Sequence, residues 1–175
     1  MKKKLKLKSL HFAVGALVIG AFLPIFIKND YYMMVLNRVL INIIVVLGLN
    51  FITGLTGQMN LGTAGIFALG AYSSALFTRY TNLTPWLGLI AAVIMGILIG
   101  RGLGYPSLRV RGVYLSLTTI GFGEVVRLLI SNTPKFTGGT QGIRNIRPYN
   151  IGSYQIQSQK EMYYLFLVFT AIAFF

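Results

Sequence analysis

Long apolar runs alternate with short polar or basic stretches along most of the chain. The runs cover residues 10–27, 33–51, 61–77, 87–100, 113–130 and 163–175. Most approach the roughly 20 residues that a helix needs to cross a bilayer. The pattern predicts an all-α integral membrane protein, a polytopic helical bundle of about five to six transmembrane segments.

The stretch GLTGQMNLGTAGIFALGAY, residues 54–72, combines membrane depth with glycines and polar side chains. Irregular backbone survives at that depth only where protein buries it or water reaches it. Broken helices of this kind recur at the binding sites of transporters. We therefore predict a broken, Gly-rich membrane segment that lines a cavity or pathway. The candidate pathway residues are Thr56, Gly57, Gln58, Asn60 and Gly62.

Two roles are open for the amides of Gln58 and Asn60. Both side chains offer hydrogen-bond donors and acceptors, so they could contact a zwitterion without burying a net charge. Alternatively, they cap the ends of a broken helix.

Composition supports the membrane assignment. Hydrophobic residues make up 55% of the chain and charged residues 11%, well below the quarter that is usual for soluble domains. The formal net charge is +13, from 16 Lys and Arg against three acidic residues. Because the basic residues lie mostly between the apolar runs, as in membrane loops, the pattern argues against nucleic-acid binding.

Residues for covalent or metal chemistry are scarce. The chain has no cysteine and a single histidine, His11, so thiolate sites are excluded and a metal site is not expected. No phosphate loop with a following Lys-Ser/Thr is present. We predict no catalytic residues, no metal, no cofactor and no enzymatic activity, and we assign any ATP hydrolysis to partner subunits.

Loop charges predict the topology. The basic start MKKKLKLK precedes the first run without an A-x-A cleavage site, which favours a retained helix with a cytoplasmic N-terminus. Residues 101–111 hold three arginines and form the most basic internal loop, placed in the cytoplasm both by charge and by counting spans. The polar residues 131–160 then lie outside, although their four basic side chains argue mildly against that side.

The fourth run carries small residues at every fourth position. Residues four apart share a helix face, and such a ladder lets another backbone approach closely. We predict helix packing along Gly88, Ala92, Gly96, Gly100 and Gly104.

Glu124 and Arg127 lie three residues apart within the fifth run. This spacing puts both on one helix face, where they can form an intramembrane ion pair. A structural pair is the favoured interpretation. A proton relay is the alternative, because acids within the membrane often serve function.

Three sequence pieces, in order, resemble the M-type permease subunit of branched-chain amino acid ABC importers. They are LGLNFITGLTGQMNLGTAGIFALGAYSSALF at 47–77, LRVRGVYLSLTTIGFGEVVRLLISN at 108–132 and FTGGTQGI at 136–143. The resemblance implies a single transmembrane permease domain over residues 1–175 in a bacterial or archaeal cell membrane. The last run is too short to span, so we expect the chain to end inside a sixth helix as a C-terminally truncated domain.

The resemblance also implies partners. They are a second, H-type permease, two cytoplasmic ATP-binding subunits and an extracytoplasmic binding protein that delivers leucine, isoleucine, valine or a related amino acid. In this family the segment that docks on the ATPase lies later in the sequence than these residues. Members also carry urea, short amides and other amino acids, so the substrate stays open. The alternative is a structural or assembly membrane protein, or a permease fragment, without transport of its own.

Overall fold

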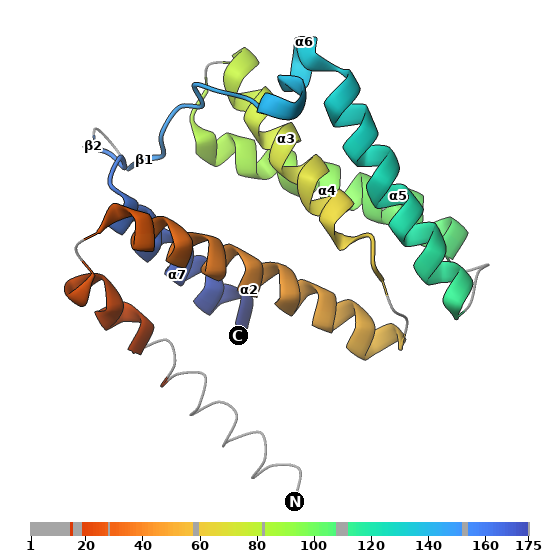
Figure 1. Cartoon of the computed structure of the whole chain (residues 1–175), viewed down its shortest axis with the longest axis horizontal. Helices are drawn as coiled ribbons and strands as arrows, with labels where there is room; N and C mark the ends of the chain where they lie inside the picture. The colour runs from red at the N-terminus through yellow and green to blue at the C-terminus, as the bar shows by residue number, and fades with distance from the viewer. Residues whose placement is uncertain are drawn as a thin grey trace, which may run out of the picture. The chain divides into compact units, whose positions relative to one another are not determined.

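A computed structural model describes residues 15, 19–27, 29–57, 60–81, 83–107, 112–151 and 154–174. These residues are mainly helical, and they form two compact units (Figure 1). The terminal unit combines Met1–Gly48 with Gln157–Phe175, and the central unit is Leu49–Ile156. His11 and most of the first apolar run lie outside the described residues.

The terminal unit joins the first part of α2 (Asp30–Thr56) to α7 (Gln159–Phe174). Its buried core is formed by Met33, Leu40 and Tyr163. The Tyr163 hydroxyl donates a hydrogen bond to the carbonyl oxygen of Gly20 at 2.8 Å. The Asn37 side-chain amide donates two hydrogen bonds to Gln159. One goes to the Gln159 backbone carbonyl oxygen at 3.1 Å, and the other goes to its side-chain oxygen at 3.0 Å. Polar bonds thus join helices that are distant in sequence.

The central unit is built on α3 (Thr63–Thr81), which packs against both α4 (Pro85–Ser107) and α5 (Val113–Asn132) (Figure 1). Close packing of α3 with α4 depends on Gly88, because a Cβ atom there would lie 2.6 Å from the Thr78 hydroxyl and 2.7 Å from the Ser74 hydroxyl. The missing side chain lets the two backbones approach.

After α5 the chain folds into short elements, the first two of which contact this helix. These are α6 (Pro134–Thr137), the 3-10 helix η1 (Gly139–Gln141), and the antiparallel strands β1 (Asn150–Ile151) and β2 (Tyr154–Gln155). The Thr137 hydroxyl contacts the carbonyl oxygens of Ile130 and Thr133 at 2.6 and 2.8 Å. Gly138 has φ +74° and ends α6 in the left-handed region, which glycine adopts without strain.

Trp86, in the first turn of α4, holds the later part of this loop. Its indole N–H donates to the carbonyl oxygen of Asn150 at 2.7 Å, and its ring packs edge-on against Tyr149 with centroids 5.3 Å apart. Burial raises the pKa of the Tyr149 phenol above its ordinary value, because desolvation disfavours the charged phenolate. Trp86 therefore fixes this part of the loop to the start of α4 by a hydrogen bond and a ring contact.

The predicted all-α class is confirmed, and so is the break. Helix α2 ends at Thr56 and α3 begins at Thr63. Three helices within the described ranges are long and apolar enough to cross a membrane: Asp30–Leu55, Pro85–Gly104 and Val113–Asn132. The full count of five to six spans stays a prediction, since much of the first run is not described.

One predicted boundary was wrong. We expected a loop to begin at Arg101, but α4 continues to Ser107. Gly102 and Gly104 lack positive φ angles, and a helical glycine lowers stability by only about 1 kcal/mol relative to alanine. Glycines alone therefore did not end this helix.

Candidate functional site

The break between α2 and α3 is the centre of the candidate site. The Gly57 N–H completes the last turn of α2 by donating to the Thr53 carbonyl oxygen at 2.8 Å. Gly57 itself has φ +65°, and no heavy atom lies within 4 Å of a Cβ built on it. The left-handed backbone angle therefore favours glycine here, whereas packing does not. Gln58 and the Thr56 side chain lie outside the described residues.

Asn60 and Gly62 organise the start of α3. The Gly62 N–H donates to the Asn60 side-chain oxygen at 2.8 Å. The Gly62 carbonyl oxygen in turn accepts from the N–H groups of Gly65 and Ile66 at 3.0 and 3.3 Å. Asn60 thus satisfies a backbone donor that precedes the helix, in an Asx turn. This is a local structural role of the kind that the capping alternative proposed.

Thr119 of α5 contacts the same short segment. The Leu61 N–H donates to the Thr119 hydroxyl oxygen at 3.1 Å, and this hydroxyl donates to the Ser116 carbonyl oxygen at 3.0 Å. The Thr119 residue is 5% exposed. Sequence reasoning did not single out Thr119, because hydroxyls in membrane helices usually bond to their own helix and carry no signal of a distant partner.

Gly62, the residue before α3, and Gly65, in its first turn, bring the start of this helix close to the backbone of α5. A Cβ on Gly62 would lie 2.7 Å from the Thr119 carbonyl oxygen, and one on Gly65 would lie 3.0 Å from the Cα of Gly123. The contact at Gly62 is closer than real Cβ atoms come, and the contact at Gly65 is tighter than most of them. Gly62, expected to line a pathway, therefore also has a packing role at this crossing.

The small-residue ladder on α4 meets two different surroundings. Gly88 lies tightly against α3, as described above. At Gly96, Gly100 and Gly104, no heavy atom of the described chain lies within 4 Å of a built Cβ. Packing along the whole ladder stays a prediction that would require a partner helix at these three positions.

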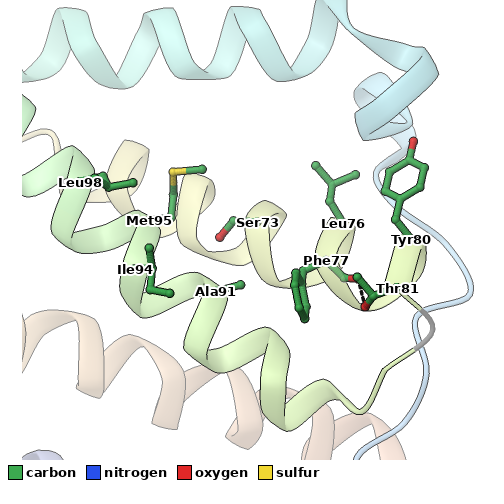
Figure 2. A pocket seen from close by; sticks show the side chains of 9 residues that line it. All are labelled: Ser73, Leu76, Phe77, Tyr80, Thr81, Ala91, Ile94, Met95 and Leu98. Atoms are coloured by element: carbon green, nitrogen blue, oxygen red, sulfur yellow. Dashed lines mark hydrogen bonds between the residues drawn. The ribbon is translucent and has the colours of Figure 1, made fainter.

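A groove of about 460 Å³ lies between α3 and α4 (Figure 2). The hydroxyls of Ser73 and Thr81 bond to the carbonyl oxygens of Gly70 and Phe77 on their own helix. The lining is otherwise mainly apolar and includes no charged side chain, so it offers few polar groups for a charged ligand. The lining residues are Ser73, Leu76, Phe77, Tyr80, Thr81, Ala91, Ile94, Met95 and Leu98.

Glu124 and Arg127 form a two-point ion pair on α5. The Arg127 Nε donates to Glu124 Oε2 at 2.9 Å, and Nη2 donates to Oε1 at 2.6 Å. The arginine and glutamate side chains are 64% and 53% exposed. Both carboxylate oxygens accept from the guanidinium. No group of three or more potential metal ligands occurs among the described residues.

Comparisons with known proteins give a consistent result. Residues 31–175 match a family model described as the permease component of the branched-chain amino acid transport system. The chain is 41% identical over 135 residues to the high-affinity branched-chain amino acid transport system permease protein LivM of Escherichia coli (strain K12). It is 40% identical over 135 residues to the Salmonella typhimurium protein of the same name.

Each alignment covers 77% of this chain and 32% of the relative. The chain therefore spans about a third of the length of these curated relatives. No solved structure matches it significantly.

Proposed function

The chain belongs to the permease family of branched-chain amino acid transport systems, and on this premise we propose that it is a membrane-embedded permease subunit of an ABC importer. The match over residues 31–175 carries the proposal. It includes the helix break and the whole α3–α5 packing unit. The proposed cargo is leucine, isoleucine, valine or a related small amino acid, as the names of the relatives indicate.

The proposed assembly contains a second permease, two cytoplasmic ATP-binding subunits and an extracytoplasmic binding protein. This family is one of transporters, so ATP hydrolysis is assigned to the ATP-binding partners. The N-terminus is proposed to be cytoplasmic, on the loop charges described above. These assignments concern the whole importer, of which the aligned region represents a part.

The proposed mechanism is alternating access, with the break at residues 57–62 lining the passage between the two permeases. Gly57 supplies the backbone turn, and Asn60 shapes the start of α3. Gln58 and Thr56 belong to this proposal by sequence. Movement of helices driven by ATP binding would expose the passage alternately to the two sides.

The remaining predicted residues have structural roles in this proposal. The Glu124–Arg127 pair keeps two charges neutralised on α5, which lowers the cost of placing them at membrane depth. The open positions Gly96, Gly100 and Gly104 on α4 are proposed to receive a helix of another permease.

Uptake measurements test the proposed function. Cells lacking the gene and paralogous importers should lose uptake of labelled leucine, and restoring the gene should return it. Unlabelled isoleucine and valine should compete, whereas urea and a basic amino acid should not. Unchanged uptake of every compound would contradict the transport proposal and favour an assembly role or a nonfunctional fragment.

A further inference from the structure

The Thr119 side chain lies where α5 crosses the beginning of α3. Its hydroxyl takes part in two hydrogen bonds, as the donor in one and the acceptor in the other. The proton goes to the Ser116 carbonyl oxygen at 3.0 Å, and the oxygen accepts the Leu61 N–H at 3.1 Å. The first bond remains on α5 and orients the hydroxyl. The second joins this helix to the break, 58 residues earlier in the chain.

The Leu61 N–H needs such an acceptor. It precedes the first turn of α3, so no helical carbonyl is in position to accept from it. The Leu61 residue is 55% exposed, but its bond to Thr119 is partly buried. An N–H that neither protein nor water satisfies is costly, and within a bilayer few alternatives exist. The next N–H, at Gly62, is satisfied locally by Asn60. Two neighbouring donors at the break thus have different acceptors, one within the segment and one on another helix.

The close approach of the two backbones makes the Thr119 contact possible. Gly62 leaves room for the Thr119 carbonyl oxygen, and Gly65 leaves room for Gly123 and the ring of Phe122. Thr119 is almost fully buried at this crossing. Its β-branched side chain has few χ1 rotamers in a helix, so the hydroxyl is held in place.

We propose that Thr119 is a positioning residue for the translocation pathway, which holds residues 60–62 against α5 through the Leu61 N–H. The break then moves together with α5, and its geometry does not depend on local capping by Asn60 alone. The transport consequence rests on the proposed permease function. The contact itself is measurable without transport.

Hydrogen exchange of the purified full-length chain, resolved to the Leu61 amide, tests the contact. Thr119→Val removes the hydroxyl while nearly preserving shape, and it should speed exchange of this amide about five- to tenfold, as expected for loss of one hydrogen bond. Thr119→Ser should retain most of the protection. If Thr119→Val does not accumulate, Thr119→Ala carries the same expectation. Unchanged exchange in the variant that lacks the hydroxyl would overturn the inference.

Thr118→Val is the matched control. It also removes a hydroxyl, one residue away, but that hydroxyl donates only to the Tyr114 carbonyl oxygen of the same helix at 2.8 Å. Exchange at Leu61 should be unaffected. Equal acceleration by the Thr118 and Thr119 variants would overturn the specific role of Thr119.

Uptake by the whole importer tests the positioning role. At equal membrane abundance, Thr119→Val should lower the maximal uptake rate severalfold and leave the half-saturating substrate concentration unchanged, with Thr119→Ser restoring the rate. Faster exchange with normal uptake would overturn positioning. If the unaltered protein transports nothing, the proposed function fails, while the exchange measurement still decides whether Thr119 holds the break.

Discussion

Gly62, the residue that precedes α3, lies directly against the backbone of Thr119 on α5: a Cβ atom on Gly62 would lie 2.7 Å from the Thr119 carbonyl oxygen. The same pair of segments is joined by the hydrogen bond from Leu61 to the Thr119 hydroxyl. The start of α3 is therefore held against α5 in two ways. Gly62 has no side chain that would keep the two backbones apart, and the Thr119 hydroxyl accepts a hydrogen bond from the Leu61 N–H.

Gly62→Ala should destabilise the chain. Because the added methyl group meets backbone atoms, which cannot rotate away, we expect a loss of roughly 1–3 kcal/mol in the free energy of unfolding. Thermal unfolding of the purified chain in detergent measures this loss. Gly70→Ala, within α3, is the control, since nothing lies within 4 Å of its built Cβ. Equal stability of both variants would contradict the close crossing.

Gly57→Ala tests the backbone angle at the break. The position has open space but φ +65°, and an ordinary residue in the left-handed region costs roughly 1–2 kcal/mol. The melting temperature should fall. Gly57→Asn should lower the melting temperature less than Gly57→Ala does, because asparagine tolerates the left-handed region better. An alanine variant as stable as the asparagine variant would show that the angle is not required.

The open part of the α4 ladder predicts a partner surface. Gly100→Leu should reduce co-purification of the second permease, because a bulky side chain would block close helix approach. The isolated chain should keep its melting temperature, since no heavy atom lies within 4 Å of a Cβ built on Gly100. Gly88→Leu should instead destabilise the isolated chain through its contact with α3. Normal co-purification of the Gly100 variant would remove this face from the proposed interface.

Trp86→Phe should loosen the loop that follows α5. The variant keeps an aromatic ring beside Tyr149 but loses the donor to the Asn150 carbonyl oxygen, a change worth about 1 kcal/mol. Protease cleavage near residues 150–155 should become several times faster. Tyr149→Phe keeps the ring contact and should leave cleavage unchanged. Similar cleavage of the Trp86 variant and the unaltered chain would argue against this anchor.

The sequence was informative where local chemistry decides the structure. Glycines and amides at membrane depth predicted the break, and the i to i+3 spacing suggested the pair that Glu124 and Arg127 form. The end of α4 was not predictable from Gly102 and Gly104, because helix propensity is a weak constraint on a long apolar helix. Thr119 was also missed, since its role depends on a contact with Leu61 that no local pattern encodes.

The central claim is that the break lines a passage, and a single thiol at Asn60 tests it most directly. The chain has no native cysteine, so Asn60→Cys can be labelled specifically with a membrane-impermeant, water-soluble thiol reagent in the whole importer. We expect labelling to block leucine uptake, and its rate to change severalfold when ATP binding switches the transporter between states. Val93 is exposed on α4, within a segment that is apolar enough to cross a membrane. A water-soluble reagent should reach it poorly there, so Val93→Cys should react slowly in every state. An Asn60→Cys thiol that is unreactive in every state, in an importer that still transports leucine, would contradict the claim.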